Sequence, residues 1–468
     1  MATPRSAAPV ALALAETLGR GSGWLAVFLL PWFLSPSEFG VVALLVTFEG
    51  VATGFLLLGQ DRAVMWRLSG NFERVGPGAS VQDTLAAAFA VTVAACVGGS
   101  LLVSGVGLAR GGELLGVPIW PHLWLLVLAV SGINANRIYL AYSRVAGQTA
   151  DFVRNRAGIG ISRLLVTLGL AWATASSLAF PLGAAIGTLV GGGSRWIRCF
   201  LPEGSRSQVL GSSRSLFSYG WPLSLHLLAM GVIGFVDRWV IGAWLGTEAV
   251  GGYSWFYMLG SAVIFLYAAA AVHFEPLIYR ATASHRSSRP VLLRFVGICL
   301  AAAGAYALLG TLLAPLLSPR IPRGFEGYAG VAPIVLVAYW MHPLYLAGTY
   351  RLAARGRTIS VAWISASTAL VAGLLCFALV PILGAMGGAW ATLGGSVVLA
   401  GGAWVALRSD EELPVPGFLW PMVPAVALPA LVVPTRIGMG VSASFVLALG
   451  VSIYLLGRRR SQANGDRT

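Results

Sequence analysis

Long apolar runs joined by short connectors decide what this chain of 468 residues can fold into. A helix needs about 20 apolar residues to cross the hydrocarbon core of a bilayer. Runs near this length lie at 9–34, 37–60, 82–107, 119–143, 155–175, 178–197, 216–243, 249–273, 291–316, 329–350, 359–380, 386–407, 417–434 and 438–457. Only 10% of the residues are charged, against about 25% in soluble domains. The sequence predicts an all-α integral membrane protein with about 14 transmembrane helices.

The distribution of basic residues predicts how these helices are oriented. All 31 basic residues are arginines: 23 lie at the chain ends and in every second connector, four in the other connectors, and four inside apolar runs. Short arginine-rich loops stay on the cytoplasmic side of a membrane. With an even number of spans, we expect both termini in the cytoplasm. The net charge of +14 predicts anionic membrane lipids as partners and not nucleic acid, because no basic patch interleaves with aromatic residues on a soluble module.

Three pairs of similar segments predict an internal repeat. The pairs are 33–40 with 244–251, 142–149 with 350–358, and 181–192 with 381–395. Their similar offsets and equal membrane orientation indicate a parallel repeat, related by an axis along the membrane normal. We expect an N-lobe at 1–210 with spans one to six, a C-lobe at 211–408 with spans seven to twelve, and spans 13 and 14 with a basic tail at 409–468. Convergence of loops on Gly, Pro and Ser would also produce such matches.

Glycine spacing within two of the runs predicts close helix contacts. Gly183, Gly187 and Gly191 are four residues apart, as are Gly384 and Gly388. Small residues at this spacing let helix backbones approach one another. The contacts would serve either sliding of the two lobes or static packing.

A few charged residues fall inside the apolar runs. An ionised side chain at bilayer depth costs roughly 2.5 kcal/mol or more, so it faces a partner or a water-filled cavity. Glu16 and Arg20 lie on one face of span one, either as an intrahelical ion pair or as the lining of a central cleft. Arg137 either extends to the membrane surface or pairs with Glu16 or Glu49. Arg163 adds a further buried guanidinium in span five.

Two further stripes of polar residues follow from helical spacing. Glu49 and Gln60 are eleven residues apart in span two, which places them on nearly the same helix face. In span seven, Tyr219, His226 and Asp237 form one stripe. Arg238 lies about 100° around that helix. A hydrogen-bonded core histidine is the alternative reading of His226.

These residues define a predicted substrate cavity. We expect it to be lined by Arg20, Arg137, Arg163, His226, Asp237 and Arg238. Candidate ion or proton coupling sites are Glu16, Glu49 and Asp237. Guanidinium groups form bidentate, charge-assisted hydrogen bonds to phosphate oxygens and stay protonated when desolvated. The predicted cargo is therefore anionic and phosphorylated. The four cysteines show no CxxC spacing, so we expect no metal, no cofactor and no disulfide framework.

Three segments resemble a known family. The resemblance lies in FLSPSEFGVVALL to GFLLLGQDRAVMWR (33–67), in the region 218–254 and in LVPILGAMGGAWATLGG (379–395). These segments are similar to the polysaccharide transporter family, the O-antigen flippases of the multidrug/oligosaccharidyl-lipid/polysaccharide exporter superfamily. In 218–254 the matching positions are Pro222, Asp237–Arg238, Leu245–Gly246 and Gly251–Tyr253. By this resemblance Asp237 and Arg238 are cavity residues, whereas Arg20, Arg137 and Arg163 follow from burial cost alone.

The resemblance implies a flippase and not an enzyme. Its cargo would be undecaprenyl-diphosphate-linked oligosaccharide, moved by alternating access from the inner to the outer leaflet of the bacterial cytoplasmic membrane for polymerisation. We expect a monomer that cooperates with polysaccharide polymerase and glycosyltransferases. A lipid II flippase and a multidrug or small-solute antiporter are the alternatives from the same superfamily. A membrane polysaccharide polymerase would need a sizeable catalytic outside loop, and 319–327 carries only Arg320, Arg323 and Glu326.

Overall fold

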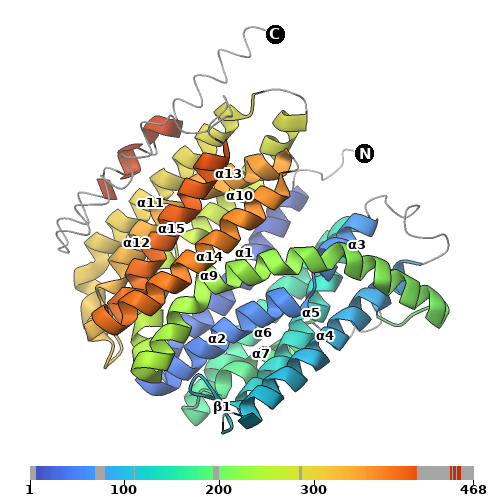
Figure 1. Cartoon of the computed structure of the whole chain (residues 1–468), viewed down its shortest axis with the longest axis horizontal. Helices are drawn as coiled ribbons and strands as arrows, with labels where there is room; N and C mark the ends of the chain where they lie inside the picture. Colours follow the sequence, from blue (N-terminus) through green and yellow to red (C-terminus); the bar gives the residue numbers. More distant parts are fainter. Residues whose placement is uncertain are drawn as a thin grey trace. The chain divides into compact units, whose positions relative to one another are not determined.

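The structure is helical almost throughout (Figure 1). The computed structural model describes residues 7–68, 80–109, 111–192, 200–283, 287–355, 357–407, 443–444, 446–449 and 451–454. Within these residues, nine helices are long and apolar enough to cross a membrane. The predicted all-α membrane class is confirmed. The count of 14 spans stays a prediction, since span 13 and part of span 14 lie outside the described residues.

The chain divides into two compact units, residues 1–251 and 252–468. The first unit therefore includes the predicted span seven, which the repeat assigns to the C-lobe. The lobe boundaries at 210 and 408 rest on the repeat alone and stay predictions.

The first unit is a bundle of helices with one short hairpin. Its elements are α1 (Ala7–Leu29), η1 (Leu30–Trp32), α2 (Pro36–Leu56), α3 (Gln60–Leu68), α4 (Val81–Ala109), β1 (Glu113–Leu114), β2 (Val117–Pro118), η3 (Ile119–Leu123), α5 (Trp124–Val145), α6 (Thr149–Thr174), α7 (Ala179–Gly192) and most of α9 (Arg206–Ser261). The two strands pair antiparallel, with Glu113 opposite Pro118. The start of α2 follows from its sequence: the side chain of Ser35 accepts a hydrogen bond from the amide of Glu38, and a proline opens the helix.

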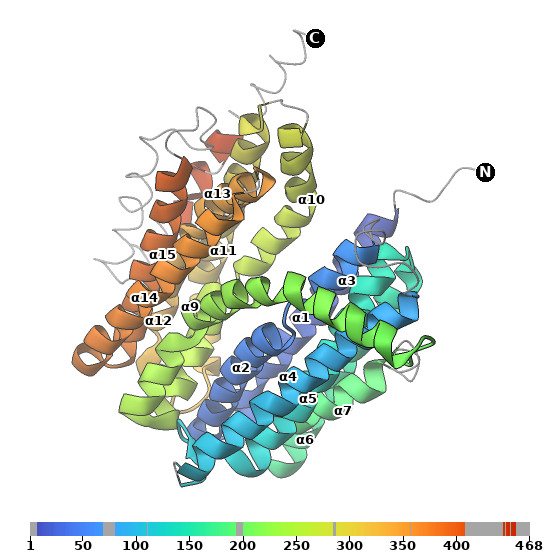
Figure 2. The ribbon, with the colours of Figure 1, turned by 45° about the vertical axis from the view of Figure 1, so that its right-hand side comes forward.

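Helix α6 packs against α1 on one side and α7 on another, and Figure 2 shows α4, α5, α6 and α7 side by side. A Cβ atom at Gly187 would lie 2.6 Å from the Cα of Arg163, and one at Gly158 would lie 2.8 Å from the carbonyl oxygen of Gly191. Such separations leave no room for side chains, so the predicted close helix contact at Gly187 and Gly191 is confirmed. It is a contact between α7 and α6 within one unit.

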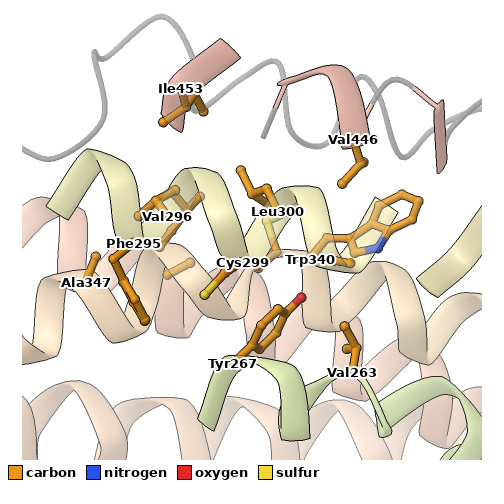
Figure 3. Close-up of a cluster of buried hydrophobic side chains, with 14 of the residues drawn as sticks. Val263, Tyr267, Phe295, Val296, Cys299, Leu300, Trp340, Ala347, Val446 and Ile453 are labelled. Carbon is orange, nitrogen blue, oxygen red and sulfur yellow. The ribbon is translucent and has the colours of Figure 1, made fainter. Parts of the chain in front are cut away.

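The second unit begins within α9 and has its own core. Its other elements are α10 (Ile264–Ala283), α11 (Arg289–Leu317), η4 (Ser318–Arg320), η5 (Glu326–Tyr328), α12 (Val331–Trp340), α13 (His342–Ala354), α14 (Thr358–Leu383) and α15 (Ala385–Leu407). Figure 3 shows Tyr267, Cys299 and Trp340 in a buried cluster that also contains Val446 and Ile453. These last two belong to the predicted span 14, whose described residues are helical and pack against this core.

Several predicted spans are broken. Span two ends at Leu56 because Leu58 and Gly59 have positive φ angles of 51° and 64°. Gln60 starts a separate helix, so the prediction that Glu49 and Gln60 share one helix face is wrong. Span ten divides at Met341 between α12 and α13.

Span seven and the first half of span eight run together in α9, with one non-helical residue at Gly246, where φ is 83°. The rest of span eight lies in α10. Gly384 also lies outside the helices, at the junction of α14 and α15, with φ 62° and open space around its missing Cβ. Gly384 itself therefore makes no close helix contact, and the contact predicted at Gly388 stays a prediction.

Candidate functional site

Charged side chains of the first unit gather on three neighbouring helices. Helix α5 carries Arg137 and Arg144, and α6 carries Arg156 and Arg163. Each pair is seven residues apart, which places its members on one helix face, about 10 Å apart along the axis. A turn of three residues joins α5 to α6, so Arg144 and Arg156 lie near the same end of the bundle. Helix α1 supplies Arg20, and these five residues form what we call the arginine cluster.

At that end, three guanidinium groups converge on one carboxylate. Arg20 Nε donates to Glu16 Oε1 at 2.7 Å. Arg156 Nε donates to Glu16 Oε2 at 3.0 Å, and Arg144 Nη2 is 3.5 Å from the same oxygen. The ring of Phe152 lies 4.8 Å below the guanidinium carbon of Arg144. We call Glu16 with its three arginines the Glu16 cage.

The remaining two arginines of the cluster form one-to-one pairs. Arg137 Nη2 donates to Asp61 Oδ2 at 3.2 Å. Arg163 Nη2 donates to both carboxylate oxygens of Glu49, at 3.0 and 2.9 Å. These two side chains are 19% and 16% exposed, so solvent screens this pair less than the cage, where Arg20 is 62% exposed. Because the pairs are neutral, the surplus positive charge of the cluster resides in the Glu16 cage.

Asp237 and Arg238 form a separate buried pair in α9. Arg238 Nη1 donates to Asp237 Oδ1 at 3.1 Å and to the carbonyl oxygen of Gly234 at 2.9 Å. The guanidinium also lies 5.7 Å from the ring centre of Phe235. These contacts hold Arg238 along its own helix. Its guanidinium is thereby stabilised at a depth where an unpaired charge would be costly.

The structure corrects several predicted partnerships. The Glu16–Arg20 pair exists, but it belongs to a larger cage. Arg137 pairs with Asp61, so the prediction that it pairs with Glu16 or Glu49 is wrong. The structure places the two residues of this pair on different helices, α5 and α3, and spacing along one helix cannot reveal such a pair. His226 lies in α9, but its side chain, like that of Tyr219, is outside the described residues.

Sequence reasoning missed Arg144, Arg156 and Asp61. They lie in α5, α6 and α3, respectively. For Arg144 and Arg156, the available signal was their spacing of seven residues from Arg137 and Arg163. Arg67 is a further charged residue within a helix, α3. It is fully buried, and burial lowers the pKa of its guanidinium while the carboxylate of Asp83 raises it.

What the site can do chemically follows from its charge. Five guanidiniums face three carboxylates, which leaves two positive charges among apolar helices. Such a group attracts anions, and guanidiniums match phosphate oxygens in geometry. That the six predicted cavity residues line a common cavity stays a prediction.

Comparison with known proteins identifies the fold. The lipid II flippase MurJ in an inward closed conformation superposes with a TM-score of 0.66 at 11% identity, covering 97% of this chain and 99% of that one. An inward-facing multidrug resistance MATE transporter of the MOP superfamily gives 0.62 at 14% identity, covering 86% and 99%. A MOP transporter from Pyrococcus furiosus, described as having a binding pocket of reversed polarity, gives 0.54 at 14%, covering 86% and 96%. A comparison with curated proteins gives no match.

The family follows from the sequence itself. Residues 10–280 match the family model described as polysaccharide biosynthesis protein. This match covers more than half of the chain, and the resemblance drawn from 33–67 and 218–254 is confirmed. The apolar helices make the protein a multi-pass membrane protein, and its fold is similar to those of the lipid II flippase MurJ and the MATE transporter. The chain belongs to the family described as polysaccharide biosynthesis protein.

Proposed function

We propose that the protein is a flippase for undecaprenyl-diphosphate-linked oligosaccharide in the bacterial cytoplasmic membrane. The observation that carries this proposal is the surplus of two positive charges in the arginine cluster. A diphosphate is the charged part of such a lipid, and it needs several guanidinium donors when it leaves water. The family description supports a role in making polysaccharide.

The position of the surplus supports a direction of transport. Both termini are proposed to be cytoplasmic, which places the turn between α5 and α6, and with it the Glu16 cage, at the cytoplasmic end. A lipid-linked sugar made in the cytoplasm would meet this end first. The diphosphate would engage the guanidiniums, the prenyl tail would stay in lipid, and the two lobes of the predicted repeat would alternate access. Glu16, Glu49 and Asp237 remain our candidates for ion or proton coupling.

The structure favours this cargo over a cationic drug. A cation exporter needs carboxylates that are available to a positive ligand. In the part of the chain that the structure describes, Glu16, Glu49 and Asp237 each have an arginine partner. Lipid II shares the prenyl diphosphate, and transport of that lipid in place of the oligosaccharide lipid is one outcome of the test below.

The test is transport by the purified protein in liposomes. Fluorescent prenyl-diphosphate oligosaccharide, lipid II and a cationic dye would be compared in parallel, with arrival in the opposite leaflet measured by enzymatic access to the sugar. Arg156→Ala should reduce transport of the oligosaccharide lipid at least tenfold. The matched control is Arg154→Ala, which removes an arginine of the same helix that pairs with Asp151 outside the cluster. Equal transport by both variants would contradict the proposal, as would transport of the dye alone.

A further inference from the structure

The carboxylate of Glu16 is surrounded as a bound anion would be. Its two oxygens accept from Arg20 Nε at 2.7 Å, Arg156 Nε at 3.0 Å and Arg156 Nη2 at 3.4 Å, with Arg144 Nη2 at 3.5 Å. Three guanidiniums are more than one carboxylate needs for neutrality. This set of donors has the composition of a phosphate site, with a side chain of the protein in the ligand's place.

The helix that carries Glu16 contains glycines that favour local bending. Residues Gly19, Gly21 and Gly23 follow Glu16 within α1, and glycine weakens a helix by about 1 kcal/mol relative to alanine. Packing explains Gly19, where a Cβ would lie 2.8 Å from Arg156 Nε. At Gly21 and Gly23 nothing lies within 4 Å of the missing Cβ. Close contact therefore does not require these two glycines, and they give α1 local freedom next to the cage.

We propose that Glu16 is an internal counter-anion, which the diphosphate of the cargo displaces from the three arginines and which returns to expel it. This inference rests on the proposed function and adds a residue that sets affinity and release. Without Glu16 the cage would bind a diphosphate more tightly, because no carboxylate would compete for the same donors. Release would slow for the same reason. Glu16 thus keeps a strongly positive site from retaining its ligand.

Whether removal of the Glu16 charge strengthens or weakens anion binding decides between this role and a structural one. A merely structural Glu16 holds three mutually repelling guanidiniums in place, so its neutralisation would scatter them and weaken anion binding. A competing Glu16 predicts the opposite. The probe is inorganic pyrophosphate, titrated into the full-length protein in lipid nanodiscs at low salt. Glu16→Gln should bind it at least about tenfold more tightly than the wild type, since one adjacent negative charge is removed.

Matched variants complete the experiment. Asp151→Asn removes a carboxylate from the exposed pair with Arg154 on α6 and should leave pyrophosphate affinity unchanged. Arg156→Ala should weaken binding. In liposomes, Glu16→Gln should lower both the half-saturating lipid concentration and the maximal rate. Equal or weaker pyrophosphate binding by a folded Glu16→Gln protein would overturn the inference.

A measurement on the wild type covers the case in which Glu16→Gln does not fold. Pyrophosphate should increase the rate at which a water-soluble carbodiimide modifies Glu16, followed by peptide mass spectrometry, because the displaced carboxylate loses its partners. An unchanged or slower modification would overturn the inference. Failure here leaves oligosaccharide transport by the wild type intact. Conversely, tight pyrophosphate binding by Glu16→Gln together with no oligosaccharide-lipid transport by the wild type would keep the counter-anion and reject the proposed cargo.

Discussion

Removing Arg163 should reveal how much the deepest pair of the arginine cluster contributes to folding. Its guanidinium contacts both oxygens of Glu49, and the two side chains are 19% and 16% exposed. Exposed ion pairs contribute about 0–1 kcal/mol, whereas breaking a fully buried pair costs about 3–5 kcal/mol. This pair lies between these limits and nearer the buried one. We expect Arg163→Ala to lower the free energy of unfolding by about 2–3 kcal/mol.

The reasoning predicts that most of this loss comes from the carboxylate left behind. Glu49→Gln in the Arg163→Ala background should therefore recover part of the stability, and the double variant should be more stable than the sum of the single losses predicts. The measurement is a double-mutant cycle on equilibrium unfolding in mixed detergent micelles, with a coupling of at least about 1 kcal/mol expected. Additive single effects would show that Glu49 finds solvent or another partner, and would refute the argument from burial.

Three further predictions concern packing and charge. Gly187→Leu should destabilise the protein by more than about 1 kcal/mol and impair transport, because a Cβ there meets the backbone of Arg163. Gly169→Leu, on the open side of α6, should be neutral or stabilising, and thermal unfolding compares the two. Thr47→Val should lower the free energy of unfolding by about 1–2 kcal/mol, because the indole N–H of Trp239, which donates to Thr47 Oγ1 at 2.7 Å, would lose its acceptor. An unchanged free energy of unfolding would argue against that hydrogen bond. Pyrophosphate affinity should fall as potassium chloride rises from 50 to 500 mM, because the screening length then shrinks to about 30% of its starting value and much of the cage is exposed to solvent. An affinity that does not depend on salt would mean that pyrophosphate binds elsewhere.

The helices were predictable because each one satisfies its own backbone hydrogen bonds in lipid. The apolar runs therefore predict α4, α14 and α15 to within a few residues. Breaks inside a run depend on local backbone angles, and the left-handed residue Leu58 carries no sequence signal comparable to its neighbour Gly59. For this reason the division of span two was not predicted.

The candidate site could be predicted only in part, for a different reason. Burial cost singles out a charge in an apolar run, so Arg163 and Glu16 were identified. Arg144 and Arg156 border the apolar runs and were missed because a charge there has no comparable burial cost. The pairing of Arg163 with Glu49 depends on how α2 and α6 are arranged, and one helix at a time cannot give it.

The glycine face of α7 makes the position of Arg163 depend on a helix that bears no charge. The segment Ala179–Gly192 contains no ionisable residue, yet its backbone sets where the Cα of Arg163 lies. A larger side chain in α7, away from any ligand, would thus change ligand affinity by moving α6, the helix that carries the Arg163 guanidinium. Substitutions in α7 could be used to adjust affinity in small steps while every charged group of the protein is kept.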